Sequence, residues 1–148
     1  MTAKLLTLAI LLCLAAPAVA AEDPCPWLNA ATAGGALGGA VQGTVAPKSC
    51  EFVRREEGHE ITLRIEVTAA SAPPAHCEAG AEAVKGIGNR AVACSYKYKP
   101  GWLAEQVVGT VRDQALLVRI ATNNPSVTAK ALRDKARNVA EQVAGNLF

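Results

Sequence analysis

The sequence predicts an α+β domain in which an antiparallel β-sheet packs with a short N-terminal helix and a long C-terminal helix, stapled by disulfides. Three observations carry this prediction. Apolar and polar residues alternate strictly over residues 60–67, which is typical of a strand with one buried face. The last twenty residues carry an apolar stripe at helical spacing. Four cysteines follow an N-terminal segment with the layout of an export signal, and cysteines of exported proteins usually form disulfides.

The N-terminal segment reads as a secretory signal peptide. Lys4 precedes an apolar run over residues 5–16, and the small residues 18–20 provide an A-x-A cleavage site. The run is shorter than the ~20 apolar residues of a spanning helix, so we expect no transmembrane segment after the signal is removed. We therefore expect a signal peptide at 1–20 and a single α+β domain at 21–148 that is exported, either periplasmic or secreted.

Neither a lipid anchor nor a nucleic-acid partner is expected. Cys13 is the cysteine of the apolar run, but the bulky Leu12 precedes it where lipid attachment needs a small residue. The chain has 15 basic and 13 acidic residues, and the two signs are interspersed. This pattern lacks the concentrated basic face of a nucleic-acid binder.

The cysteines left after signal removal are expected to be structural. They are Cys25, Cys50, Cys77 and Cys94, and four cysteines allow three disulfide connectivities. Sequential pairing is the simplest of the three. Each bridge would then contribute about 3 kcal/mol in the loop-entropy model, a large share of the stability of a small domain.

Chemistry at a metal, cofactor or nucleophile has little support in the sequence. A zinc site drawn from His59, His76, Cys77 and Cys94 lacks the usual C-x-x-C or H-x-x-x-H spacing. No serine of the domain stands in a G-x-S-x-G elbow, and the lone G-x-G at 86–88 is typical of a turn. We therefore expect no metal, no cofactor and no enzyme activity.

The N-terminal half of the domain is predicted to contain one helix and three strands. Asn29 can cap a helix over residues 30–37, which Gly38 can end. The clearest strand covers residues 60–67, because Ile61, Leu63, Ile65 and Val67 fall on one side of an extended chain. Two shorter strands precede it, at 41–45 and 49–54.

The middle of the chain is predicted to hold a helix, a strand and a hairpin. Residues 75–84 are rich in Ala and Glu and favour a helix. A strand follows over 90–96, after the glycine turn. The hairpin pairs 106–111 with 115–122, where apolar residues again alternate along the second strand.

The last helix is predicted over residues 127–146. Ser126 is interpreted as its starting residue, with Pro125 at or near the first turn. An apolar stripe predicts that it packs across the dry face of the sheet. The stripe consists of Leu132, Ala136, Val139, Ala140, Val143 and Leu147.

The candidate binding surface is an aromatic and basic segment between the strand at 90–96 and the hairpin. Tyr96, Tyr98, Lys99 and Trp102 lie within seven residues, in a chain that is only 4% aromatic. Alternation would place the two tyrosines on one side and Lys97 and Lys99 on the other. Such a segment can stack on a sugar ring or contact an anionic partner. The alternative is a strand end whose aromatic rings close the core while the lysines stay in solvent.

Six short pieces follow one another along nearly the whole domain. They are Asp23-Pro24-Cys25, Trp27-Leu28, the helix at 30–38, Cys50-Glu51-Phe52, Gly86-Ile87-Gly88-Asn89 and the helix from Val127. In this order they resemble a family of uncharacterised actinobacterial-type cell-envelope proteins, most of them lipoproteins. The resemblance implies a Mog1/PsbP-like fold and a Cys25–Cys50 disulfide, with Cys77 and Cys94 as an additional bridge. It implies no catalytic residues, because the activity of that family is not established.

We therefore expect an exported, non-enzymatic binding or accessory protein of the cell envelope. Its expected partner is an envelope protein or a cell-wall component, contacted as a monomer through a sheet face or through residues 96–102. The alternative is a carrier of a small apolar, lipid-like ligand. That function needs a pocket between the sheet and the last helix, where small residues on the helices would leave space.

Overall fold

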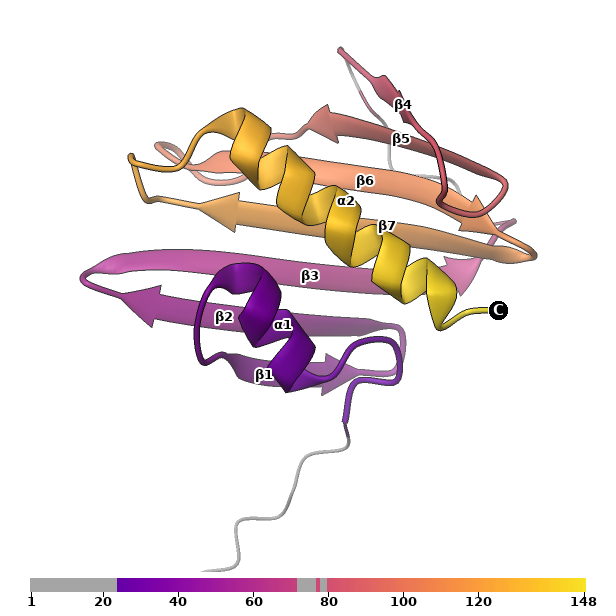
Figure 1. Cartoon of the computed structure of the whole chain (residues 1–148), viewed down its shortest axis with the longest axis horizontal. Helices are drawn as coiled ribbons and strands as arrows, with labels where there is room; N and C mark the ends of the chain where they lie inside the picture. The colour runs from indigo at the N-terminus through magenta and orange to yellow at the C-terminus, as the bar shows by residue number, and fades with distance from the viewer. Residues whose placement is uncertain (1–23, 72–76, 78–79) are drawn as a thin grey trace, which may run out of the picture.

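A computed structural model describes residues 24–71, 77 and 80–148. The predicted signal peptide and Cys13 lie outside these residues. Both helices cover one face of an antiparallel seven-stranded sheet of order β1-β2-β3-β7-β6-β5-β4 (Figure 1), which confirms the predicted α+β class. In chain order the elements are α1 Ala30–Leu37, β1 Gln42–Ala46, β2 Ser49–Glu56, β3 His59–Ala69, β4 Glu82–Val84, β5 Arg90–Ser95, β6 Leu103–Val111, β7 Gln114–Thr122 and α2 Ala129–Gly145.

The core lies between the helices and the covered face of the sheet. The strand that alternates most clearly, β3, pairs with β7 so that Leu63 lies opposite Ile120 and Ile65 opposite Val118. These four side chains have no exposed surface. Six residues of α2, which lies mainly over β6 and β7, belong to the same core and are at most 2% exposed, namely Leu132, Ala136, Val139, Ala140, Val143 and Ala144. The predicted packing of the last helix across the dry face is therefore confirmed, with Leu147 only partly buried.

The first helix forms as predicted and is tied to the sheet by a disulfide. The Asn29 Oδ1 accepts a hydrogen bond from the Thr32 N–H at 2.8 Å, and Gly38 ends the helix at a φ of 87°. Just before the helix, Cys25 is bonded to Cys50 of β2, with an S–S distance of 2.06 Å. The covalent bond places α1 over β2 and β3.

The start of the second helix differs from the prediction. Its N-cap is Thr128, whose Oγ1 accepts from the Ala131 N–H at 3.2 Å, so the helix begins at Ala129. Ser126 instead donates its N–H to the Asn124 Oδ1 at 2.9 Å, which holds residues 124–126 in a turn before the helix. Among the residues that the structure describes, neither helix is long and apolar enough to cross a membrane.

The helix predicted over 75–84 is wrong in its described part. Residues 82–84 form strand β4, which pairs with residues 91–93 of β5. Gly80 has a φ of 66°, a conformation that an α-helix does not continue through. Burial of Val84 (6% exposed) together with the backbone hydrogen bonds of the sheet outweighs the local helix propensity. Residues 75, 76, 78 and 79 of the predicted helix lie outside the described residues.

A candidate binding surface on the open face of the sheet

The face of the sheet that carries no helix, called the open face here, has a continuous row of polar side chains. Register places Glu51, Arg64, Arg119, Gln106 and Cys94 side by side across β2, β3, β7, β6 and β5. Two arginines therefore stand directly opposite each other, an arrangement that costs energy unless their charge is balanced. This row was not predicted, because it depends on which strands are neighbours.

The two arginines are balanced in different ways. Arg64 contacts Glu66 at 2.6 Å and Glu51 at 3.7 Å, and the hydrogen bond to Glu66 raises the pKa of Arg64. Arg119 instead donates from Nε to the Gln106 Oε1 at 3.1 Å. Within the described part of the chain, no carboxylate lies at ion-pair distance from Arg119. Arg119 is therefore a partly buried cation of this face without an anionic partner among the described residues.

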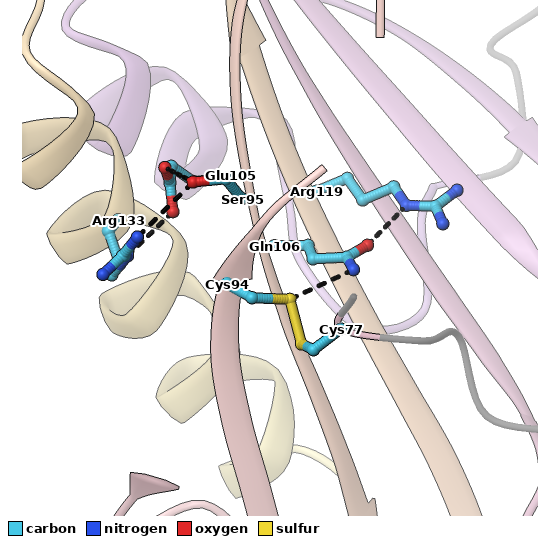
Figure 2. Close-up of a disulfide and its surroundings, with 7 residues drawn as sticks. All are labelled: Cys77, Cys94, Ser95, Glu105, Gln106, Arg119 and Arg133. Carbon is cyan, nitrogen blue, oxygen red and sulfur yellow. Dashed lines mark hydrogen bonds and ion pairs between the residues drawn. A yellow bond between two sulfur atoms is a disulfide. The ribbon is translucent and has the colours of Figure 1, made fainter. Parts of the chain in front are cut away.

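A disulfide holds the neighbour of Arg119 in place. Cys77 and Cys94 are bonded with an S–S distance of 2.00 Å, which confirms the second sequential pair. The Gln106 Nε2 donates to the Cys94 Sγ at 3.3 Å, so disulfide, amide and guanidinium form one chain of contacts (Figure 2). The bridge also occupies both sulfur atoms of the zinc site considered above, whose His76 lies outside the described residues.

The predicted aromatic segment forms a cluster next to this chain. The Tyr98 ring lies between Tyr96 and Trp102, with centroid distances of 6.2 Å and 5.2 Å and edge-on geometry. The Tyr96 N–H donates to the Ala104 carbonyl, and the Trp102 N–H donates to the Lys99 carbonyl, which closes the loop. The structure brings the predicted residues together, and their role in binding stays a prediction.

Alternation predicted that Lys99 lies on the side opposite the tyrosines, and this prediction is wrong. Its Nζ stands 5.0 Å from the centroid of the Tyr98 ring and 4.8 Å from that of Trp102. The period of two fails because β5 ends at Ser95, so the segment follows a turn rather than a strand. Lys99 therefore covers part of the aromatic surface, through cation–π contacts.

The aromatic cluster and the arginines border a common hollow of about 280 Å³. Tyr96 and Tyr98 form one wall, and the Arg119 guanidinium carbon lies 5.0 Å from the centroid of the Tyr96 ring. Arg64 and its two carboxylate partners on β2 and β3 also line the hollow. Arg64 and Arg119 thus extend the predicted site, and the signal for both was their place on the polar side of an alternating strand.

Burial of the Tyr96 side chain, which borders this hollow, keeps its hydroxyl protonated. Desolvation raises the pKa of Tyr96 to about 12, although the nearby Arg119 acts in the opposite direction. The phenol is therefore a neutral hydrogen-bond donor and acceptor over the whole physiological range.

This shift predicts how stability changes in alkali. The unfolded chain releases the Tyr96 proton near pH 10, whereas the folded chain keeps it up to about pH 12. The folded state therefore loses stability as the pH rises between these two values. Urea unfolding at pH 9 and pH 11 should show a larger loss for the wild type than for Tyr96→Phe. Equal losses in the two proteins would contradict the shift.

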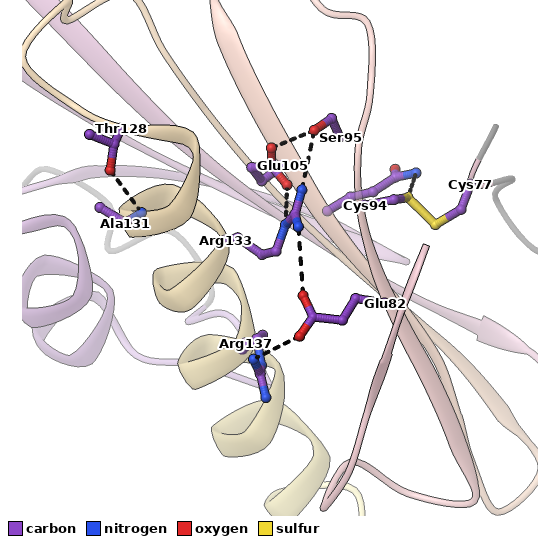
Figure 3. Close-up of polar contacts among 10 residues, drawn as sticks. Cys77, Glu82, Cys94, Ser95, Glu105, Thr128, Ala131, Arg133 and Arg137 are labelled. Carbon is purple, nitrogen blue, oxygen red and sulfur yellow. Dashed lines mark hydrogen bonds and ion pairs between the residues drawn. A yellow bond between two sulfur atoms is a disulfide. The ribbon is translucent and has the colours of Figure 1, made fainter. Parts of the chain in front are cut away.

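A second polar cluster, on the covered face, is structural. Glu105 is 1% exposed and accepts from the Arg133 Nε of α2 at 2.8 Å and from the Ser95 Oγ at 2.5 Å (Figure 3). Glu82 of β4 lies 3.6 Å from Arg133 and 3.8 Å from Arg137. The hydrogen bond to Glu105 raises the pKa of Arg133. These ion pairs fasten α2 to strands β4 and β6.

A further hollow of about 280 Å³ lies on the helix side, between the end of α1, the turn of β2 and β3, and α2. Four of its lining residues are charged, namely Arg54, Glu56, Glu60 and Lys135, and His59 joins them. Leu37, Ile61 and Val127 also line it, and the carrier of an apolar ligand stays an untested alternative.

Comparisons with models of protein families, with curated proteins and with solved structures found no match for this chain. The resemblance to a family of envelope proteins therefore stays a prediction. The function is argued below from the geometry of the open face.

Proposed function

We propose that this chain is an exported, non-enzymatic binding or accessory protein of the cell envelope that acts through the open face of its sheet. The observation that carries the proposal is the cluster of Tyr96, Tyr98, Lys99 and Trp102, in which the two tyrosines border a hollow that Arg119 also lines. Aromatic and arginine side chains are the types most enriched where proteins bind their partners.

The exposure of the cluster supports a contact surface rather than a core. Tyr98 remains 43% exposed although it packs against two other aromatic rings, and Leu103 beside the loop is 40% exposed. When a partner covers an exposed side chain of this size, apolar surface leaves water and the free energy of the complex is lowered. The rings also hold each other in fixed positions, which lowers the entropy lost on binding.

Two other observations support an exported, non-enzymatic role. Both disulfides join cysteines of the folded domain, and such bonds persist in oxidising compartments. The Ser95 hydroxyl, one of the few candidate nucleophiles, donates to Glu105, and Arg133 holds that carboxylate. Glu105 is therefore engaged in an ion pair that joins β6 to α2, which is a structural role.

Photo-crosslinking in the native host tests the proposal. A photoreactive residue at Tyr98 should give a discrete adduct with one partner. The same residue at Lys130 of α2 is the control, because that side chain is 86% exposed but lies on the covered side. Equal labelling at both positions, or no adduct at either, would overturn the proposal.

A further inference from the structure

We propose that the hollow beside the aromatic cluster binds a sugar that carries a single carboxylate, and that Arg119 holds this carboxylate. This inference rests on the proposed function and names the class of ligand for the same surface. Three features of the lining lead to it. They are an arginine whose two terminal nitrogens have no partner among the described residues, a balanced set of charges, and an aromatic wall next to carboxylate acceptors.

The Arg119 guanidinium is held in position but not neutralised. Its Nε is committed to the Gln106 Oε1 at 3.1 Å, and its central carbon lies 5.0 Å from the Tyr96 ring centroid. The two terminal nitrogens have no hydrogen bond or ion pair within the described residues. They remain available as a planar pair of donors, the geometry that matches a carboxylate with two parallel hydrogen bonds.

The hydrogen bond to Gln106 restricts rotation of the Arg119 guanidinium. Gln106 is 1% exposed, and its amide nitrogen donates to the Cys94 Sγ of the disulfide, so its oxygen is fixed toward Arg119 (Figure 2). A cation held in this way loses little freedom when a ligand arrives, which favours binding of a small anion.

The charges of the lining limit the ligand to one negative charge. Arg64 and Arg119 carry two positive charges, and Glu51 and Glu66 carry two negative charges. Both carboxylates are already directed at Arg64, so the uncompensated positive charge is local to Arg119. A doubly charged phosphate would stand near two carboxylates and be repelled, whereas a single carboxylate meets Arg119 alone.

The remaining surface suits a ring with hydroxyl groups. Glu51 and Glu66 are 44% and 29% exposed, and their free oxygens can accept hydrogen bonds from hydroxyls. The rings of Tyr96 and Tyr98 offer an apolar wall to the C–H face of a pyranose. With about 280 Å³, the hollow is at the small end of ligand pockets and holds one ring rather than a long chain.

The test compares methyl glucuronide with methyl glucoside, two sugars that differ in the carboxylate. The full-length domain with both disulfides intact is titrated with each sugar, and binding is followed by heteronuclear NMR of the Trp102 indole and the Gln106 amide. Methyl glucuronide should bind at least about tenfold more tightly than the glucoside, and glucose 6-phosphate should bind more weakly than the glucuronide.

Arg119→Lys should weaken glucuronide binding by about tenfold or more, because a lysine keeps the charge but not the planar pair of donors. The matched control is Arg55→Lys, which changes an arginine of the same face at the end of β2, where it pairs with Glu60. This control should leave binding unchanged. Thermal unfolding of both variants checks that the fold is retained.

Equal binding of the two sugars, no binding of either, or an unchanged affinity in Arg119→Lys would overturn the inference. These outcomes do not decide the proposed function, which depends on whether Tyr98 captures a partner in the host. A Tyr98 adduct together with no binding of the sugars would retain a binding protein and reject the sugar acid.

Discussion

Replacing Arg133 with methionine should lower the free energy of unfolding by about 3 kcal/mol. The substitution leaves the buried Glu105 carboxylate with the Ser95 hydroxyl as its remaining donor among the described residues. An ion pair that loses one member strands the other charge in a medium that solvates it poorly, and such losses cost about 3–5 kcal/mol. We take the lower end of this range because the Arg133 side chain is 27% exposed. Urea unfolding at neutral pH measures the difference.

Lys130 provides the control for this experiment on the same helix. It forms an ion pair with Asp134 one turn later, at 2.8 Å, but its side chain is 86% exposed. Lys130→Met should therefore change stability by less than about 0.5 kcal/mol. A similar loss in both variants would mean that the burial of Glu105 does not determine the energy of its ion pair.

Replacing Gly88 with alanine should also destabilise the domain, by about 3 kcal/mol. Gly88 has a φ of 54°, and a Cβ at this position would lie 2.2 Å from the Thr110 carbonyl oxygen and 2.7 Å from the Val111 Cγ2. The first of these atoms is backbone of β6, so relief of the clash requires the loop to move away from the sheet. The cost combines a left-handed backbone, worth about 1–2 kcal/mol, with overpacking, worth about 1–3 kcal/mol.

Gly86, two residues earlier, separates these two causes. It has a φ of 84°, but no atom lies within 4 Å of the point where a Cβ would stand. Gly86→Ala should therefore cost only about 1 kcal/mol, from backbone strain alone. Thermal or urea unfolding of the two alanine variants gives the comparison. If Gly88→Ala were no worse than Gly86→Ala, the contact with β6 would contribute nothing.

The strands that the sequence predicts best are those whose burial repeats with the pleat. In β3 and β7 every second residue faces the helices, so the apolar pattern alone reveals the strand and its buried side. Strand β4 was missed because three residues carry no such pattern, and its Ala and Glu residues have no preference for a strand. Its position follows from pairing with β5, which is a property of the fold.

The candidate site was predicted in part, for a related reason. The aromatic residues lie close together in the sequence, so their clustering could be expected without knowledge of the fold. Arg64 and Arg119 come from strands that are far apart in the chain and become neighbours when β3 pairs with β7. Only the register of the sheet shows that they border the same hollow as Tyr96.

The Cys77–Cys94 disulfide also bears on how fast the domain folds. The pairing of β3 with β7 joins Ala69 to Gln114, which closes a loop of about 45 residues, and contacts of this kind slow folding. The disulfide lies inside that loop and shortens the path through it by 17 residues. The shorter loop lowers the entropic cost of closure by about 0.4 kcal/mol. The central strands of the oxidised chain therefore meet about twice as often as those of the reduced chain.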